Sequence, residues 1–330
     1  MGSLYVAQQG CTLSLKKEMV IIKQGQVVID QVQLPLLEQI LIFGQSQVTT
    51  QLIRACLKRQ IPIAYLSRMG YCYGRIVAIE TGYRQLSRYQ QQLTDEECLK
   101  TARMIVQAKL KNSRVLLIRH QRRHGSEAIK SIIQTLAHLA EQCQQADSIP
   151  RLMGIEGIGA ASYFQGFGDC LIHDDFIFTA RSRRPPGNPV NAMLSFGYQV
   201  LWNHLLSLIE LKGLDPYFAC LHQGGYRHAA LASDLIEEFR AAIVDSLTLY
   251  LINRKLMDPV QDFEFRDGGC FLNERGRKIY LRAFLMRMEE SLVASDQSSQ
   301  PRWHCLSVQV DTYKRFVYQP VDGYKPYLIR

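Results

Sequence analysis

The 330-residue sequence is 47% hydrophobic and 21% charged, and its 39 Lys and Arg residues against 30 Asp and Glu give a net charge of +9. This composition excludes a disordered chain and is compatible with a polyanionic partner such as nucleic acid. The sequence contains no apolar run near the roughly 18 residues of a membrane helix and no secretory signal. Its nine cysteines form no CxxC pair, so we expect a cytoplasmic protein with reduced thiols and no membrane association.

The first part of the chain has the pattern of a small β-rich domain. A helix interrupts this region, and we expect Ser46 to cap it. Gly25 can take the positive φ of a hairpin turn. Short segments rich in β-branched and aromatic residues predict strands at residues 3–8, 12–15, 19–23, 26–30, 61–67 and 73–79.

From Thr94 onward the pattern is helical, starting with the capping-box sequence TDEE. Apolar periodicity predicts further helices at residues 126–145, 188–211, 228–254 and 273–292. Residues 294–330 read as part helix and part loosely ordered tail. The sequence therefore predicts an α+β protein with a small N-terminal β-rich domain (1–85). A larger all-α domain (86–330) follows, with a partly ordered tail from about 295.

Positive charge is concentrated in two stretches. Residues 98–126 contain eight Lys or Arg and no acidic residue, and a Pro-rich loop at 181–187 contains three more arginines. Such groups hold phosphate backbones through charge-assisted hydrogen bonds, although a solvated helix face would explain the first stretch equally well. The candidates for DNA contact are Arg119, Arg122, Arg123, Arg181, Arg183, Arg184 and Arg227.

The densest chemical pattern lies between His222 and Arg240. Asp234 and Glu237 are three residues apart, so on a helix both carboxylates leave the same face. A Gly-rich turn after His222 would fold its imidazole towards them, and such a mixed N/O set suits Mn²⁺ or Mg²⁺. The alternative is that the carboxylates are solvated charges pairing with Arg240 and that His222 is a hydrogen-bonded turn residue.

Glu156 is a second candidate, because it stands alone among small and apolar residues. An unpaired buried charge is costly, so a glutamate in such surroundings is often paired or functional. Ordinary surface exposure is the alternative for this residue.

Three stretches in order resemble the CRISPR-associated integrase family of the spacer-acquisition machinery. The first is GIEG at 154–157 with Tyr163 and Phe164. The second is RPP at 184–186 with PVNAMLSFGY at 189–198, and the third runs from LDPY at 214–217 to DLIEEFR at 234–240. Their order and spacing match across about ninety residues.

The resemblance implies a metal site made by Glu156, His222 and Glu237 that takes Mg²⁺ or Mn²⁺, with Asp234 beside it as a further catalytic acid. It implies that the helical domain is catalytic and that the β-rich domain forms a homodimer. It also implies a heterocomplex with a small second adaptation protein. The implied DNA partners are a protospacer fragment and the CRISPR repeat.

We therefore expect a metal-dependent DNA integrase or endonuclease that inserts short foreign fragments into a CRISPR array. The reaction would be attack of a 3′-hydroxyl on a repeat phosphodiester. Two alternatives stay open: a metal-dependent nuclease acting on branched or single-stranded DNA, and a non-catalytic nucleic-acid-binding scaffold. Integration and cleavage differ only in whether a hydroxyl or water attacks, so the ligand set does not separate them.

Overall fold

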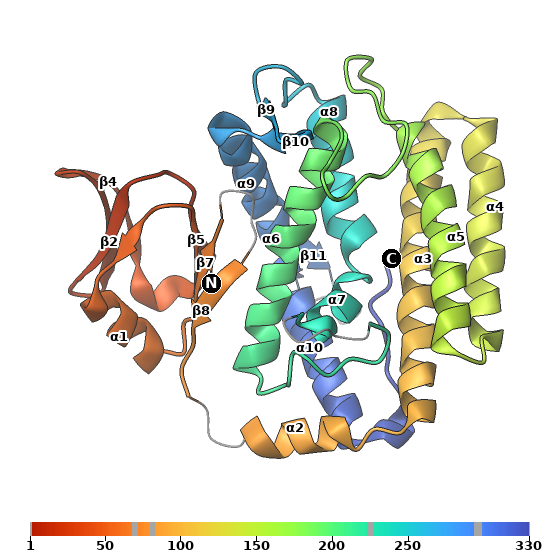
Figure 1. The fold of residues 1–330 in the computed structure, drawn as a ribbon, viewed down its shortest axis with the longest axis horizontal. Helices are drawn as coiled ribbons and strands as arrows, with labels where there is room; N and C mark the ends of the chain where they lie inside the picture. Colours follow the sequence, from red (N-terminus) through yellow and green to blue (C-terminus); the bar gives the residue numbers. More distant parts are fainter. Residues whose placement is uncertain (1, 68–71, 80–82, 223–227, 294–298, 330) are drawn as a thin grey trace.

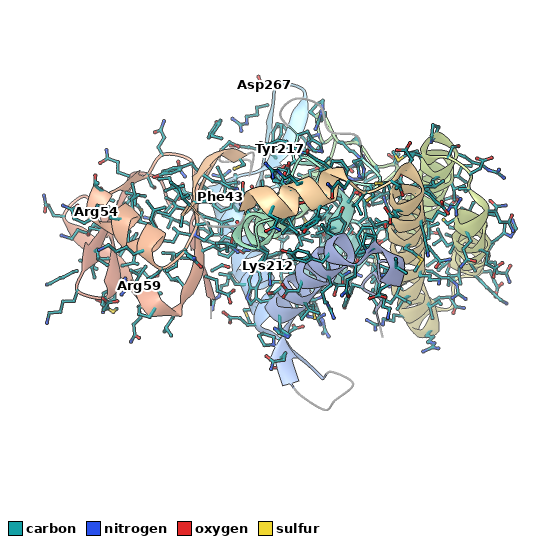
Figure 2. All side chains as sticks on the ribbon, turned by 90° about the horizontal axis from the view of Figure 1, so that it is seen from below. Phe43, Arg54, Arg59, Lys212, Tyr217 and Asp267 are labelled. Atoms are coloured by element: carbon teal, nitrogen blue, oxygen red, sulfur yellow. The ribbon has the colours of Figure 1, made fainter. Side chains whose placement is uncertain are left out.

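The computed structural model describes residues 2–67, 72–79, 83–222, 228–293 and 299–329. Figure 1 shows a β-rich N-terminal part, a central group of helices around α6, and an outer group formed by α3, α4 and α5. Seen from below, these three parts lie in a row, with Arg54 and Arg59 on the β-rich part and Phe43 where it meets the helices (Figure 2). The structure confirms the predicted α+β class, a β-rich region followed by a mostly helical one.

Two four-stranded sheets make up the β-rich part. Their strand orders are β1-β5-β7-β8 and β4-β3-β2-β6. Gly25 has a φ of +59° in the turn between β3 and β4, as the sequence predicts. The strands are β1 (Gly2–Val6), β2 (Cys11–Lys16), β3 (Met19–Gln24), β4 (Val27–Gln33), β5 (Leu37–Phe43), β6 (Gln47–Val48), β7 (Ile63–Leu66) and β8 (Cys72–Ile76).

Strand β5 is absent from the sequence prediction, although it is central in its sheet. Ile40 and Ile42 are buried in the core between the two sheets. Leu41 and Phe43 are buried in the larger core shared with the helices. A strand covered on both faces is a continuous apolar run without alternation, and such a run gives no period-2 signal.

The helix that interrupts the β-rich part, α1 (Thr50–Lys58), begins later than predicted. Thr49 is its N-cap and accepts from the backbone N–H of Leu52. Ser46 donates instead to the carbonyl of Gln8, so the predicted cap is wrong. Ser46 and Thr49 are both residue types that cap helices, and they are only three residues apart, so the sequence alone did not separate them.

The helical part starts with α2 (Tyr83–Gln91) and the long α3. The predicted capping box at Thr94 is confirmed: its hydroxyl accepts from the backbone of Glu97, and its backbone donates to the Glu97 side chain. Two short hairpins, β9–β10 (Phe263–Arg266, Gly269–Leu272) and β11–β12 (Ser291–Val293, Ser299–Pro301), interrupt this part. The remaining α-helices are α3 (Asp95–His124), α4 (Glu127–Gln142), α5 (Ile149–Gly168), α6 (Pro189–Leu211), α7 (Ala230–Ile236), α8 (Ser246–Asn253), α9 (Glu274–Glu289) and α10 (Arg302–Tyr318).

Two helical predictions need correction. The single helix predicted at 228–254 is broken: α7 ends at Ile236, and a π-helix (Arg240–Asp245) leads into α8. The tail predicted as loosely ordered contains α10, and residues 319–329 then run back along α3 (Figure 1). Tyr324 in this segment is only 3% exposed.

The predicted domain boundary after residue 85 falls inside α2, and the division into two domains stays a prediction. The β-rich and helical parts share a core, in which the rings of Phe43 and Phe196 lie 6.0 Å apart. Among the residues that the structure describes, no helix is long and apolar enough to cross a membrane.

Candidate active site

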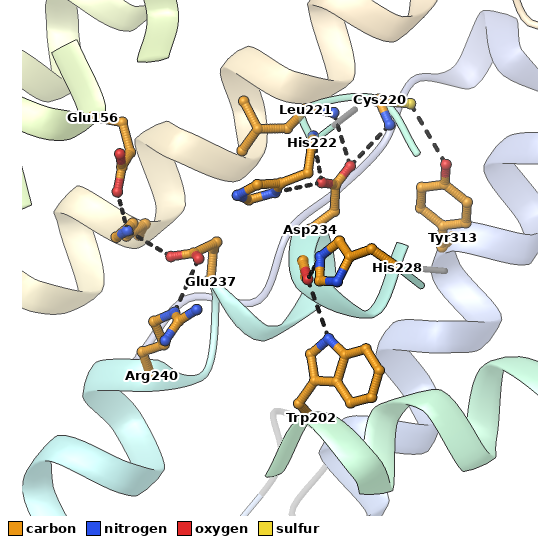
Figure 3. A network of polar contacts seen from close by, with 12 residues as sticks. Glu156, Trp202, Cys220, Leu221, His222, His228, Asp234, Glu237, Arg240 and Tyr313 are labelled. Carbon is orange, nitrogen blue, oxygen red and sulfur yellow. Dashed lines mark hydrogen bonds and ion pairs between the residues drawn. The ribbon is translucent and has the colours of Figure 1, made fainter. Parts of the chain in front are cut away.

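Three helices distant in sequence contribute the charged centre of the candidate site (Figure 3). Lys109 comes from α3, Glu156 from α5, and Glu237 from the turn directly after α7. Gly159 allows α3 and α5 to approach closely, since a Cβ there would lie 2.3 Å from the Leu110 side chain. Gly159 thus serves helix packing beside the site, whereas a Cβ at Gly154 or Gly157 would meet no atom within 4 Å.

Lys109 lies between the two glutamates. Its Nζ forms ion pairs with Glu156 Oε1 and, at 2.6 Å, with Glu237 Oε2. Arg240 Nε donates to the other oxygen of Glu237 at 2.9 Å. Burial alone would raise the pKa of Glu237, but Arg240 and Lys109 lower it to about 2. Glu237 is therefore a carboxylate near neutral pH, held by two cations.

Burial distinguishes this arrangement from a solvated ion pair. The side chains of Lys109, Glu156 and Glu237 are 11%, 17% and 5% exposed. From the sequence, Lys109 is only one of the basic residues at 98–126. Its position between two carboxylates becomes visible only in the folded structure. The alternative that Glu156 is an ordinary surface residue is wrong, because its side chain is mostly buried and pairs with Lys109.

Asp234 holds the segment that carries His222. Its Oδ2 accepts from the backbone N–H groups of Cys220 and Leu221, both at 2.8 Å. Its Oδ1 accepts from the backbone N–H of His222 at 2.9 Å and lies 2.9 Å from Nδ1 of the same residue. Burial opposes charge on the imidazole, but Asp234 raises the pKa of His222 above its ordinary value.

These contacts revise the sequence reading of the acidic pair. Asp234 and Glu237 do not share one helix face, because α7 ends between them at Ile236. Both are buried, so the solvated alternative is wrong, although Glu237 does pair with Arg240. Asp234 acts on His222 and its loop, as Figure 3 shows, while Glu237 faces Lys109.

The segment before α7 is fixed by a second small network. Trp202 Nε1 donates to Ser233 Oγ at 3.1 Å, and this hydroxyl lies 2.8 Å from His228 Nε2. The Trp202 and His228 rings stack with centroids 6.1 Å apart. These contacts anchor the chain between residue 228 and Asp234.

A small pocket adjoins the charged centre. Tyr163 and Tyr198 both donate to Asp245, whose pKa is raised by burial. The Arg240 guanidinium carbon lies 4.3 Å from the centre of the Tyr198 ring. The pocket lining includes Lys109, Ser113, Tyr163, Arg181, Arg183, Tyr198, Arg240 and Asp245.

The predicted DNA-contact arginines occupy different positions. Arg183 and Arg184 are exposed in the loop before α6. Arg181 turns inward, donating to Asn191 Oδ1 at 2.9 Å and Ser195 Oγ at 3.0 Å, so it anchors that loop.

The remaining predicted arginines lie on α3 or outside the described residues. Arg119 and Arg122 are exposed on α3, and Arg119 lines a separate cavity of about 500 Å³. Lys109 and Arg119 are ten residues apart on that helix, a rise of roughly 15 Å. Arg227 and the side chain of Arg123 lie outside the described residues.

The donor types present suit a hard divalent cation. Glu156 and Glu237 already share one cation, the Lys109 ammonium. The Nδ1 of His222 is held by a carboxylate, as metal-binding histidines usually are. Within the described ranges, no group of three or more His, Cys, Asp or Glu side chains is gathered closely enough to hold an ion. The residues fit Mg²⁺ or Mn²⁺ by type, and an ion shared by Glu156 and Glu237 would have to displace Lys109.

Comparison with known proteins matches the chain to one family. A family model described as CRISPR associated protein Cas1 matches residues 4–285. The chain is 32% identical over 349 residues to the CRISPR-associated endonuclease Cas1 1 of Chlorobaculum tepidum, with 100% of this chain and 99% of the relative covered. It is 35% identical over 300 residues to a CRISPR-associated exonuclease Cas4/endonuclease Cas1 fusion of Geobacter sulfurreducens. That match covers 88% of this chain and about half, 53%, of the fusion.

Two solved structures share the fold. A Cas1 protein from Thermotoga maritima superposes with a TM-score of 0.82 at 23% identity, covering 100% of both chains. A casposase bound to its integration product superposes with a TM-score of 0.83 at 21% identity, covering 99% of this chain and 92% of the casposase.

Proposed function

The chain belongs to the Cas1 family of CRISPR-associated proteins, and on that premise we propose that it is a metal-dependent DNA integrase and endonuclease. In the proposed reaction, the 3′-hydroxyl of a short DNA fragment attacks a phosphodiester of a CRISPR repeat. The curated relatives described above are named as endonucleases, which supports phosphodiester chemistry at the shared site.

The observation that carries the proposal is the pair of buried carboxylates, Glu156 and Glu237, that share one cation. Phosphoryl transfer needs neutralisation of charge on the attacked phosphate and on the leaving oxygen. A divalent ion held by Glu156, Glu237 and His222 would supply that Lewis acidity. The pair sits beside a basic pocket, as a polyanionic substrate requires.

Other residues of the site would position the proposed metal ligands and the DNA. Asp234 orients the His222 ring by holding Nδ1 and the loop backbone, so we assign it a positioning role. Arg240 holds Glu237 ionised. Exposed Arg183 and Arg184 would contact the phosphate backbone and position the DNA without reading its sequence.

The proposed partners follow from family membership. They are a protospacer fragment, the CRISPR repeat, a second copy of this chain and a small second adaptation protein. Arg119, Arg122, Arg123 and Arg227 remain further candidates for DNA contact, together with the loop arginines named above.

The decisive experiment compares Glu156→Ala and His222→Ala with the wild-type protein. A labelled fragment with a free 3′-hydroxyl is incubated with repeat duplex and Mn²⁺, and joined product is measured together with duplex affinity. We expect both variants to bind duplex as the wild type does and to lose strand joining. Glu141→Ala, at an exposed glutamate of α4, is the matched control and keeps full activity. Full joining by both site variants would refute the assignment.

The same assay separates the alternatives. Joined product supports integration, whereas release of short fragments alone supports a nuclease that uses water as the nucleophile. A protein that binds DNA without either product, with or without Mn²⁺, would be a non-catalytic scaffold.

A further inference from the structure

Two consecutive glutamates follow the end of α7, and the helix break there gives them different partners. Glu237 pairs with Lys109 and Arg240, whereas Glu238, 0% exposed, faces the tail of the chain. Between α7 and the π-helix, Phe239 N–H donates to the carbonyl of Ile236 at 2.9 Å. The position of Glu237 therefore depends on an irregular turn.

Residues 324–329, which we name the tail latch, bind this turn directly. Tyr324 donates its hydroxyl to Glu238 Oε1, and the backbone N–H of Tyr327 donates to Oε2 at 2.6 Å. The Tyr327 ring stacks on Phe239 with centroids 4.8 Å apart. Gln309 of α10 donates to the Tyr324 hydroxyl at 2.6 Å, which ties the tail latch to that helix.

Asn112 joins the tail latch to α3. Its Nδ2 donates to the Glu238 carbonyl at 2.8 Å and to the Tyr327 carbonyl at 3.0 Å, and its Oδ1 accepts from Ile329 N–H at 2.9 Å. Asn112 stands one turn after Lys109 on the same helix. One segment of α3 thus contacts Glu237 through Lys109 and the neighbouring turn through Asn112.

We propose that the tail latch is a positioning element for the active site, which fixes the turn after α7 so that Glu237 reaches its site partners. This inference rests on the proposed function. A buried carboxyl group that loses its donors is costly. Without the tail latch, Glu238 would rotate towards water and take the backbone of Glu237 with it. Misplacement of a reacting group by about 1 Å costs roughly 100-fold in rate.

The test uses Tyr324→Phe, which removes one hydroxyl and keeps the ring, in the full chain. Its matched control is Tyr318→Phe, because Tyr318 is a 53% exposed residue of α10. Mn²⁺ affinity is measured by electron paramagnetic resonance, and backbone hydrogen exchange is followed at residues 236–240. We expect Tyr324→Phe to weaken Mn²⁺ binding by about tenfold, to lower kcat for strand joining at unchanged KM, and to speed exchange at the turn.

A merely structural role predicts a lower melting temperature with wild-type Mn²⁺ affinity and exchange at 25 °C, and that result would overturn the inference. If Tyr324→Phe does not fold, Tyr327→Ala replaces it in the test. This variant removes the ring that stacks on Phe239 and keeps the backbone hydrogen bonds, and we expect the same changes from it. If the wild type binds no Mn²⁺ and Glu156→Ala joins DNA normally, the proposed function has failed. In that case faster exchange at the turn still supports the tail latch, and unchanged exchange overturns it.

Discussion

Replacement of Lys109 by Met removes the cation that Glu156 and Glu237 share. The substitution keeps the length and packing of the side chain and deletes only the ammonium. Glu237 retains Arg240, whereas Glu156 forms no other ion pair within the described part of the chain. The variant therefore leaves one mostly buried carboxylate without a cation.

The expected loss of stability follows from that geometry. Breaking a buried ion pair costs about 3–5 kcal/mol. Because Glu156 is 17% exposed and Glu237 keeps a partner, we expect the lower limit, about 3 kcal/mol in the free energy of unfolding. In a chain of this size that corresponds to a melting temperature lower by roughly 5 °C in EDTA.

Added Mn²⁺ should reduce the difference in stability between Lys109→Met and the wild type. At the proposed site the ion would compete with the Lys109 ammonium for the same carboxylates in the wild type, and in Lys109→Met it would not. We expect Mn²⁺ to bind the variant about tenfold more tightly, or about 1.4 kcal/mol, so at saturating Mn²⁺ the stability difference from the wild type should fall from about 3 to about 1.6 kcal/mol. Thermal unfolding across a Mn²⁺ titration measures both effects. Lys111→Met, at an exposed lysine of the same helix, is the control. Weaker Mn²⁺ binding in Lys109→Met would refute competition.

Three further predictions concern positioning, packing and pH. Asp234→Asn should weaken Mn²⁺ affinity by about 10–100-fold in calorimetry, because the His222 ring and its loop lose a charged acceptor. Gly276→Ala should lower the free energy of unfolding by about 2 kcal/mol, since a Cβ there would lie 2.1 Å from a backbone oxygen. Gly154→Ala is the control: a Cβ there would meet no atom within 4 Å, so the free energy of unfolding should not fall. Calorimetric unfolding of both variants measures the difference. Burial lowers the pKa of His204 to about 3, so only the unfolded state gains this proton as pH falls below about 6.5. Between pH 7 and 5 the protein should lose about 2 kcal/mol of stability, and His204→Gln should remove that part of the slope.

The sequence predicted structure correctly where neighbouring residues alone determine the local conformation. The capping box at Thr94 and the hairpin turn at Gly25 need only neighbouring residues, and both predictions are confirmed. Strand β5 failed because its apolar run is explained only by two cores, one on each face. The helix predicted at 228–254 failed for a similar reason, since its break is held by contacts with α3 and the tail.

The site shows the same division. Residue types and order led to Glu156, His222, Asp234 and Glu237. The metal-binding role of Glu156, His222 and Glu237 and the catalytic role of Asp234 stay predictions. Lys109 carried no local signal that distinguished it from other basic residues of α3. Its position depends on three helices that together span more than a hundred residues of sequence, and such contacts are absent from any single stretch of sequence.

The charges of the site argue that the proposed divalent ion and the nucleic acid would bind together. Glu156 and Glu237 are balanced by Lys109 and Arg240. A divalent ion that displaced Lys109 would put two positive charges where the ammonium had one, so the buried centre would have excess positive charge. A phosphodiester would supply the compensating negative charge, and the exposed Arg183, which lines the small pocket beside the site, would contact it. Coupling of this kind is reciprocal, so Mn²⁺ should bind more tightly when DNA is present, and DNA more tightly when Mn²⁺ is present. We expect a gain of about tenfold, within the usual range for linked sites. Equal Mn²⁺ affinity with and without DNA would show that the protein alone neutralises the ion.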